Sequence, residues 1–386
     1  MTFKGKYFFG AHMNYEAKQQ KVMEKNRRLL IICPYPRGCA GSQRFRFEQY
    51  IPFLEQKKIT VHLRSFLTPW GWRVVYKEGY AVIKVLATLI GFFRRLIDLF
   101  SLHRYDLVFI HREASPIGPP FIEWWIAHIA KKQILYDFDD AIWINNTANP
   151  GIARFKKPQK TVHICNWASM VFVGNQYLAD FASQYNNNVT VVPTTIDTQN
   201  HHNVIKDHHK NTPTHTLCIG WTGSHSTLAY LQDVEGVLRK IQDKHSIRIK
   251  IIADKAPQAL SFPFDFEAWD IQLEVNQLLD IDIGIMPLPN EEWAKGKCGF
   301  KALQYLSLGI PCVASPVGVN KKIVLNNKNG LWAESAHDWF VALETLLLDQ
   351  MLRNRLGKAG RNRVVQCFSV ESQKDVFVRE IERLLL

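Results

Sequence analysis

KGKCGFKALQYLSLGIPCVASP, residues 295–316, shows how this chain is built. Apolar residues recur at the spacing of one helical face, so the sequence predicts a helix over residues 299–308. A Gly-Ile-Pro sequence ends that helix, and the apolar residues after it predict a buried strand over 312–315. A helix that leads directly into a buried strand is a unit of a parallel α/β sheet. The apolar positions of the helical face are Phe300, Leu303, Leu306 and Ile310.

The same alternation of helices and strands fills two blocks, which a polar stretch at residues 197–215 separates. Strands that alternate with helices indicate a parallel sheet covered on both faces. The expected strands are 28–35, 59–66, 105–113, 133–143, 170–175 and 189–194 in the first block, and 217–221, 247–253, 281–287 and 312–315 in the second. The expected helices are 45–56, 81–100, 120–130 and 176–185 in the first block, and 228–242, 273–279, 299–308, 338–348 and 370–386 in the second.

The predicted fold class is therefore α/β, with two Rossmann-like domains that face each other across a cleft. A chain of 386 residues is long enough for two such domains. Ligands of these sheets bind at the carboxyl ends of the strands, so we expect a site between the domains. The predicted parts are an N-terminal extension (1–26), an N-terminal acceptor domain (27–197), a linker (198–215), a C-terminal donor domain (216–365) and a C-terminal helix (366–386) that packs back on the N-terminal domain.

The linker contains five histidines and lacks the period of a helix or a strand. A metal site and a solvated linker are the two interpretations of this cluster. We expect a solvated linker, because nothing nearby in the sequence fixes a coordination geometry. The histidines are His201, His202, His208, His209 and His215.

Composition restricts the partners and the compartment. The chain holds 48 Lys and Arg against 35 Asp and Glu, a net charge of +13, which favours a nucleic acid, a membrane surface or a phosphorylated ligand as partner. The basic residues are dispersed and form no recognition motif, so no nucleic-acid partner is expected. Seven cysteines without CxxC spacing, and an N-terminus without the apolar core of a signal peptide, predict a cytoplasmic protein.

No stretch reaches the roughly 18 to 20 apolar residues of a membrane-spanning helix. The nearest candidate, residues 81–100, is interrupted by four charged residues. Its apolar residues share one helical face, which leaves two interpretations: a helix that packs on its own domain, or a helix that lies on the anionic inner face of a membrane. That face comprises Val82, Val85, Leu86, Leu89, Phe93, Leu96, Ile97 and Phe100.

Two lysines lie at the start of the helix predicted over 299–308. Lys297 and Lys301, together with Gln304, recur at i, i+4 and i+7 and share one face. Cations are unfavourable near the positive N-terminal end of a helix dipole, and a bound anion would compensate for both lysines. A solvated cationic face is the alternative interpretation.

A phosphate-type turn lies in the same half of the chain, in GWTGSHST at residues 220–227. A strand ends there and a helix is expected to begin, Gly223 permits a close backbone approach, and Ser224 and Ser226 offer hydroxyls. Free amides at a helix N-terminus bind phosphate readily, although the stretch matches neither the P-loop nor the GxGxxG pattern. An ordinary strand-to-helix turn is the alternative. The turn and the two lysines together favour an anionic ligand.

Residues 282–324 resemble the donor-sugar segment of retaining glycosyltransferases of family four, the glycosyl transferases group 1. The resemblance covers about residues 28–375. It implies the two-domain GT-B fold and the transfer of a sugar from a nucleoside-diphosphate sugar to an acceptor hydroxyl with retained anomeric configuration. Other stretches with close family counterparts are 41–54, 107–120, 134–143 and 171–197.

The resemblance places the donor in the C-terminal domain, where this chain departs from the family pattern. Many members carry two glutamates in an E-x7-E pattern, and the matching positions here are Gly296 and Gln304. Glu291 or Glu292 in the preceding loop is a candidate substitute. The predicted donor-binding residues are Gly223, Ser224, Ser226, Trp269, Glu292, Phe300 and Gln304.

The usual Arg/Lys pair of the family is also absent after the first strand of this domain, and we expect Lys297 and Lys301 to supply its positive charge. Both are predicted to be catalytic, because negative charge grows on the departing diphosphate. The mechanism needs no protein nucleophile if the acceptor attacks from the face of the leaving group.

The acceptor is expected in the N-terminal domain, where polar residues follow three strands. Packed carboxylates raise one another's pKa, which suits a group that handles hydroxyl protons, so Asp139 and Asp140 are predicted to be catalytic. A capping and turn cluster is the alternative. The D-x-D at 137–139 matches the metal motif of single-domain glycosyltransferases, but no metal is expected because the lysines supply the charge. The predicted acceptor-binding residues are Gly41, Ser42, Arg44, Arg112, Glu113 and Asp137.

The predicted function is a retaining glycosyltransferase of the hexosyltransferase type. It would act on a glycan or lipid-linked acceptor in cell-surface polysaccharide synthesis, without a cofactor, and would contact an anionic membrane peripherally. A sugar-nucleotide epimerase or hydrolase of the same fold, and a sugar-nucleotide binding protein without catalytic activity, are the alternatives.

Overall fold

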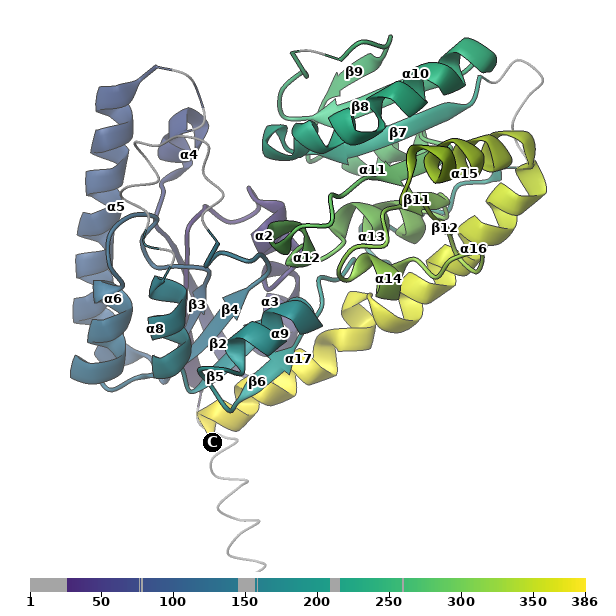
Figure 1. Ribbon diagram of the computed structural model, residues 1–386. Coiled ribbons are helices and arrows are strands. Elements are labelled where there is room, and N and C mark those ends of the chain that lie inside the picture. Colours follow the sequence, from purple (N-terminus) through teal and green to yellow (C-terminus); the bar gives the residue numbers. More distant parts are fainter. Residues whose placement is uncertain are drawn as a thin grey trace, which may run out of the picture.

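The computed structural model describes residues 26–75, 77, 79–144, 157, 159–208, 216–258 and 260–386. These residues form two α/β domains, each built on a parallel sheet of six strands (Figure 1). The predicted α/β class with two Rossmann-like domains is therefore confirmed. The predicted N-terminal extension lies, except for Asn26, outside the described residues.

The first sheet has the strand order β2-β1-β3-β4-β5-β6. The order reverses between β1 and β3, and ligands of such sheets bind beside this reversal, at the carboxyl ends of the strands. The central strands are buried on both faces and therefore consist of nearly continuous apolar residues. The strands are β1 (Arg27–Cys33), β2 (Ile59–Ser65), β3 (Leu107–His111), β4 (Gln133–Phe138), β5 (Met170–Val173) and β6 (Val189–Val191). The helices are α2 (Gly41–Arg44), η1 (Glu48–Tyr50), α3 (Ile51–Gln56), α4 (Pro69–Val75), α5 (Ala81–Ser101), η2 (Leu102–Arg104), α6 (Phe121–Trp124), η3 (Trp125–Ile129), α8 (Lys160–Trp167) and α9 (Gln176–Ala182).

The second sheet has the order β12-β11-β10-β7-β8-β9, which is the doubly wound order of a Rossmann fold, and it reverses between β7 and β10. Its strands are β7 (Cys218–Gly223), β8 (Arg248–Ala253), β9 (Asp265–Ala268), β10 (Ile283–Met286), β11 (Cys312–Ala314) and β12 (Leu331–Trp332). Its helices are η5 (His225–Val234), α10 (Glu235–Lys244), α11 (Glu274–Leu279), α12 (Glu292–Lys295), α13 (Phe300–Ser307), α14 (Asn320–Ile323), α15 (Ala336–Leu348) and α16 (Gln350–Cys367).

The chain returns to the N-terminal domain through α17 (Val370–Leu385). Figure 1 shows α16 and α17 in yellow, running from one domain to the other. Phe377 and Ile381 of α17 are buried in the core of the first sheet, and Phe377 stacks on Tyr50 with ring centroids 4.3 Å apart. Full burial of such a side chain contributes about 1.5–3 kcal/mol, so α17 fixes the C-terminal end of the chain to the first domain.

Several elements differ from the sequence expectations. The helix expected at 228–242 is a 3-10 helix, η5, followed by α10. The strand expected at 133–143 ends at Phe138, because the next two side chains turn away to bind charged partners. Strands β9 and β12 were not expected, since β9 is an exposed edge strand without an apolar run and β12 has two residues.

The prediction of a solvated linker at 198–215 is wrong for two of its histidines, whereas residues 199, 200, 203–205 and 207 are exposed. His202 and His208 are buried, with 0% and 1% of their surface exposed. Arg361 of α16 donates a hydrogen bond to the carbonyl oxygen of His202 at 2.5 Å. Tertiary contacts, rather than a helix or a strand, bury these two histidines, so no regular period marks them in the sequence. Two of the five histidines, His209 and His215, lie outside the described residues.

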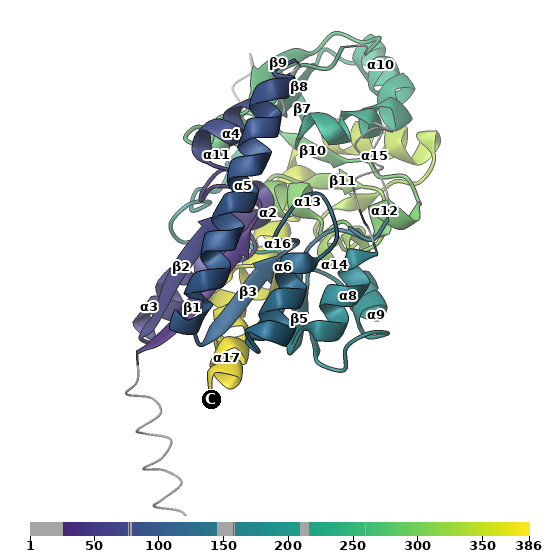
Figure 2. The same ribbon diagram turned by 90° about the vertical axis from the view of Figure 1, so that its left-hand side faces the viewer.

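Helix α5 lies along the outer side of the N-terminal domain and faces the viewer in Figure 2. All eight residues of its apolar face are exposed to solvent, at 47% or more of their surface. The opposite face packs on the domain through small residues, and a Cβ on Gly91 would lie only 2.5 Å from the ring of Phe66. The interpretation that this apolar face packs on its own domain is therefore wrong.

The charged residues that interrupt the apolar sequence of α5 explain this arrangement. Arg95 and Asp98 point inward and are buried as an ion pair of 2.8 Å, and Arg95 also donates to the carbonyl oxygens of Ala114 and Cys33. The helix thus presents charge to the domain and apolar side chains to the outside. Among the described residues, no helix is both long enough and apolar enough to cross a membrane.

Candidate functional site

Asp139 and Asp140 follow β4 and meet side chains from both domains. Arg112, which follows β3, donates to Asp139 Oδ1 through Nε and to Asp140 Oδ2 through Nη2, both at 2.7 Å. Lys297 of the C-terminal domain donates to Asp140 Oδ1 at 2.9 Å. The structure therefore brings together three of the predicted catalytic residues and the predicted acceptor residue Arg112.

The neighbouring charges lower the pKa of Asp140, whereas the sequence analysis predicted that it would be raised. Burial alone would raise the pKa of Asp140, but Lys297 and Arg112 outweigh burial and hold the pKa below its ordinary value. Burial would also lower the pKa of Lys297, but Asp140 outweighs it and raises that pKa. The expectation that packed carboxylates raise one another's pKa is wrong for Asp140, because neighbouring cations dominate.

Small residues allow the two domains to approach each other here. A Cβ on Gly174 would lie 2.1 Å from Cys298 Sγ, and a Cβ on Gly296 would lie 2.7 Å from a side chain of the N-terminal domain. Asn175, the N-cap of α9, donates to the carbonyl oxygens of Gly296 and Lys297 at 3.1 and 3.0 Å. In this arrangement of the domains no glutamate would fit at position 296, where many family members carry one.

Lys301, on α13, lies beside the reversal of the second sheet, between β7 and β10. Its Nζ is 5.1 Å from the centre of the Trp221 ring and 3.4 Å from Thr227 Oγ1. Gly223 provides the space, because a Cβ there would lie 2.6 Å from Lys301 Cε. Burial and the nearby charge of Lys297 lower the pKa of Lys301 to about 7. A bound anion would oppose both effects.

The phosphate-type turn after β7 is partly occupied by protein groups. The amide of His225, the first residue of η5, donates to Asp254 Oδ1 at 2.6 Å. The prediction of free amides at this helix start is therefore wrong for His225. The hydroxyls of Ser224 and Ser226 lie 2.8 Å apart at the surface, where a ligand can reach them.

Glu274, the first residue of α11, forms a second contact between the domains. Its carboxylate accepts hydrogen bonds from Arg44 at 2.8 Å, Trp269 Nε1 at 3.1 Å and Gln304 Nε2 at 3.3 Å. Two predicted donor residues and one predicted acceptor residue therefore converge on a residue that the sequence analysis missed. Arg44, which was predicted to bind the acceptor, thus contacts the domain that was predicted to bind the donor. Its Cζ also lies 5.9 Å from the centre of the Trp269 ring. The only sequence signal for Glu274 was its place at the start of a predicted helix.

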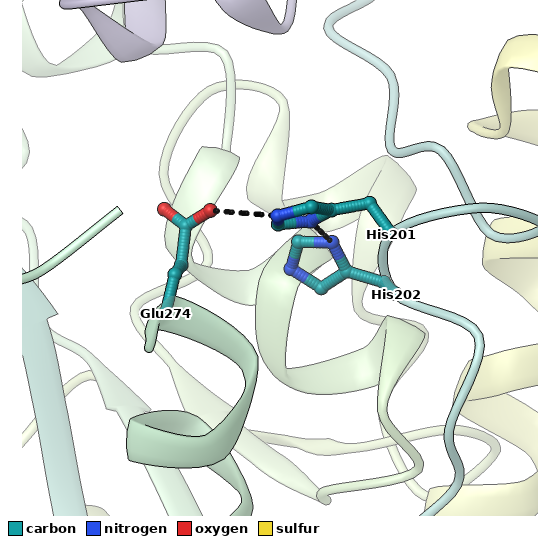
Figure 3. Close-up of side chains that lie close together, drawn as sticks. All are labelled: His201, His202 and Glu274. Carbon is teal, nitrogen blue, oxygen red and sulfur yellow. Dashed lines mark hydrogen bonds and ion pairs between the residues drawn. The ribbon is translucent and has the colours of Figure 1, made fainter. Parts of the chain in front are cut away.

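His201 and His202 approach Glu274 from the segment between the domains (Figure 3). The two Nδ1 atoms are 2.9 Å apart, and His201 Nε2 lies 3.8 Å from Glu274 Oε2. Within the described ranges these three residues are the one group of His, Cys, Asp or Glu side chains that could hold a metal ion. Arg44 already neutralises Glu274, so the group fits a divalent ion only if Arg44 releases the carboxylate. The histidines nevertheless have a neighbour that could complete a coordination shell, contrary to the sequence expectation.

Two of the predicted acceptor residues are engaged by the N-terminal domain itself. Asp137 is buried, forms an ion pair with Arg46 and lies 2.7 Å from His111 Nδ1. Its prediction as an acceptor-binding residue is wrong, because the carboxylate faces the core and is satisfied there. Glu113 is partly exposed and forms an ion pair with Lys160.

Gly41 and Ser42 face the C-terminal domain at the start of α2. A Cβ on Gly41 would lie 3.7 Å from the ring of Phe300, and that ring packs on Phe45 with centroids 4.4 Å apart. Phe300, predicted to bind the donor, is thus a contact between the domains, whereas Ser42 stays partly exposed.

Glu292 also contacts the opposite domain. Its carboxylate accepts hydrogen bonds from the Tyr177 hydroxyl at 2.5 Å and from Lys295 at 2.6 Å. In this structure Glu292 does not take the place of the missing family glutamate, and Glu274 is the carboxylate that contacts Gln304. Tyr230, which the sequence analysis missed, lies close enough for Lys297 to influence its pKa.

Residues 275–363, which include the two lysines and most of α11, match the family model described as Glycosyl transferases group 1. This matched segment is similar to the group 1 glycosyltransferases. The resemblance seen in the sequence is confirmed by this match. The comparison with curated proteins found no match for this chain.

Solved structures share the fold over nearly the whole chain. Sucrose-phosphate synthase from Thermosynechococcus elongatus has a TM-score of 0.69 and 15% identity, over 93% of this chain and 99% of that one. HepE from Anabaena, in complex with UDP and glucose, has a TM-score of 0.63 and 13% identity, over 92% and 100%. The catalytic domain of starch synthase IV from Arabidopsis thaliana, bound to ADP and acarbose, has a TM-score of 0.65 and 11% identity, over 94% and 100%. The predicted GT-B fold is thus confirmed for this chain.

The low pKa of Lys301 predicts proton uptake when a diphosphate binds. At pH 8 an amine with a pKa of about 7 is mostly neutral, and a bound anion raises the pKa, so the amine takes up a proton. Calorimetry with inorganic pyrophosphate, in buffers of different ionisation enthalpy, should show about one more proton taken up by the wild-type protein than by Lys301→Met. Lys328→Met, a change of an exposed lysine, serves as the control. Equal proton uptake in wild type and Lys301→Met would contradict the assignment.

Proposed function

We propose that this protein is a retaining hexosyltransferase that moves a sugar from a nucleoside-diphosphate sugar to a hydroxyl of a glycan or lipid-linked acceptor in cell-surface polysaccharide synthesis. The observation that carries the proposal is the position of Lys301, beside the reversal of the second sheet and within the matched family segment. The titles of two structural neighbours name bound UDP or ADP, which supports a nucleoside diphosphate as the ligand class.

In the proposed mechanism the lysines receive the diphosphate. Lys301 lies beside Trp221 and Thr227, and the exposed hydroxyls of Ser224 and Ser226, which are hydrogen-bonded to each other, lie on the same turn. Negative charge grows on the diphosphate as the sugar departs, and a cation in a water-poor site stabilises that charge strongly. The acceptor hydroxyl attacks from the face of the leaving group, and a diphosphate oxygen takes its proton.

The ion pair between the domains gives donor binding a second effect. A phosphate placed between Lys297 and Lys301 competes with Asp140 for Lys297, which now binds Asp140 at 2.9 Å. Asp140 would remain charged through Arg112 and would gain a free oxygen for a hydrogen bond from the acceptor hydroxyl. In this proposal Asp139 and Asp140 orient the acceptor, and Arg112 positions both carboxylates.

Metal independence is part of the proposal. The D-x-D carboxylates are not arranged for an ion, because Asp137 is paired with Arg46 and Asp139 with Arg112. The charge that a divalent ion would supply at the diphosphate is supplied by Lys297 and Lys301.

Helix α5 is proposed to place the protein on an anionic membrane, at the inner face in a cytoplasmic setting. The helix has 21 residues, about 30 Å, and its exposed apolar face runs from Val82 to Phe100. Asp98, the one acidic residue of α5, is buried, whereas Lys84 and Arg94 stay partly exposed. Apolar side chains flanked by cations bind anionic bilayers in the plane of the interface.

Kinetics of lysine variants test the function. With the donor found in a panel of nucleoside-diphosphate hexoses, Lys301→Ala should lower kcat by about a hundredfold or more, about 3 kcal/mol, because the growing charge loses a stabilising cation. Lys301→Arg should retain part of the rate, and Lys328→Ala should match the wild type. Nuclear magnetic resonance of the product should show a retained anomeric configuration. Unimpaired turnover in both Lys297→Ala and Lys301→Ala would refute this mechanism. Sugar release or epimerisation without any acceptor would favour a sugar-nucleotide hydrolase or epimerase.

Chelation tests metal independence. Turnover should be unchanged by EDTA, since lysines and hydroxyls hold the diphosphate. The matched variant His201→Ala separates the two candidate metal sites. If EDTA abolishes turnover and manganese restores it, a metal is required. If His201→Ala then also abolishes turnover, the metal lies at the histidines. If His201→Ala keeps its turnover, the metal lies at the aspartates.

Vesicle binding tests the membrane proposal. The protein should sediment with vesicles of phosphatidylglycerol and phosphatidylcholine and should be released by high salt, because part of the attraction is electrostatic. The double variant Leu89→Ser/Phe93→Ser should bind weakly with an unchanged Tm, since both side chains are exposed. Leu348→Ser/Met351→Ser, two exposed apolar residues of the other domain, should bind like the wild type. A large loss of Tm in the α5 variant, or vesicle binding equal to wild type, would contradict the proposal.

A further inference from the structure

A groove lies between α5 and the segment that follows β3. It has a volume of about 240 Å³ and is lined by Phe92 and Leu96 of α5, by Ser115, Ile117, Gly118 and Pro119, and by Phe121 and Ile122 of α6. Ser115 is the one polar side chain among these lining residues, and its hydroxyl already donates to the carbonyl oxygen of Ile117 at 3.2 Å. The groove therefore offers an apolar surface with little capacity to bind a sugar.

The two ends of the groove lead to different parts of the molecule. At its rim, Leu96 and Phe121 are about half exposed, and Leu96 belongs to the apolar face of α5. At the other end, Ser115 is three residues from Arg112, a span of at most about 11 Å of extended chain. The carbonyl oxygen of Ser115 accepts a hydrogen bond from Lys160, which is also paired with Glu113. Ser115 thus belongs to the lining of the groove and, through Lys160, is linked to Glu113, the neighbour of Arg112 in the chain.

We infer that this groove holds part of the hydrocarbon chain of a lipid-linked acceptor, whose polar head reaches Arg112 and Asp140. The inference rests on the proposed function and specifies its acceptor. The volume is below the roughly 300–1,000 Å³ of pockets that enclose a drug-sized ligand, so it suits a slender chain rather than a sugar ring. Leu96 lines the groove and also belongs to the exposed face of α5, so the rest of the chain can remain in the membrane. A phosphate that links lipid and sugar would compete with Glu113 for Lys160 and with Asp139 for Arg112.

The experiment uses farnesyl phosphate with a diazirine at the far end of its hydrocarbon chain, below its micelle concentration, on the full-length protein. After photolysis, mass spectrometry should find the label on residues 92–96 and 117–122. Unmodified farnesyl phosphate should compete with the label, whereas inorganic phosphate should not. Ile117→Asp should lower labelling by more than about tenfold, because it places a charge in the apolar groove. Val82→Asp, at an exposed position of α5 outside the groove lining, should leave labelling unchanged.

Labelling spread evenly along α5 from Val82 to Phe100 would overturn the inference in favour of general insertion into lipid. If labelling decreases under conditions in which light scattering shows dimers, a second copy of the chain covers this face and the inference is overturned. Absent labelling would also overturn it. Calorimetry with UDP on the same preparations distinguishes a failure of the groove inference from a failure of the proposed function. Normal UDP binding without labelling refutes only the inference about the groove. Labelling without any nucleotide binding or sugar transfer refutes the proposed function.

Discussion

The ion pair between Lys297 and Asp140 is the interaction on which the arrangement of this site depends. It joins the segment before α13 to the end of β4, and it can form because Gly174 and Gly296 leave room for a close approach. Two partly buried charges lose hydration when they pair, so such a contact is favourable only with further hydrogen bonds. Arg112 supplies them on the carboxylate side. An anionic ligand that reaches Lys297 therefore acts on both domains at once.

Helix α5 shows how a helix can reverse the usual distribution of polarity. Arg95 and Asp98 are buried because they satisfy each other and the carbonyl ends of neighbouring segments, and the large apolar residues consequently face outward. The hydrophobic effect then favours a surface that covers them. In the proposed function a membrane would cover this surface and would bring a lipid-linked acceptor to the N-terminal domain.

Sequence reasoning singled out Lys297 and Lys301 because two cations at a helix start need compensation. In the structure Asp140 of the other domain compensates Lys297, and the role of both lysines stays a prediction. Glu274 was missed, although it contacts Arg44, Trp269 and Gln304, because those partners are distant in sequence. The sign of the pKa shift at Asp140 was wrong for the same reason, since a cation from the other domain decides it.

The amino-acid sequence alone determined the α/β class, the two domains and the resemblance to group 1, because hydrophobic period and turn residues are local properties. It also showed that 81–100 is amphipathic. Only the tertiary structure decided which way that helix faces, that Asp137 points into the core, and that His202 is buried. Each of these outcomes depends on which side chains the fold brings together, since burial and charge compensation are set by neighbours that the chain order does not reveal.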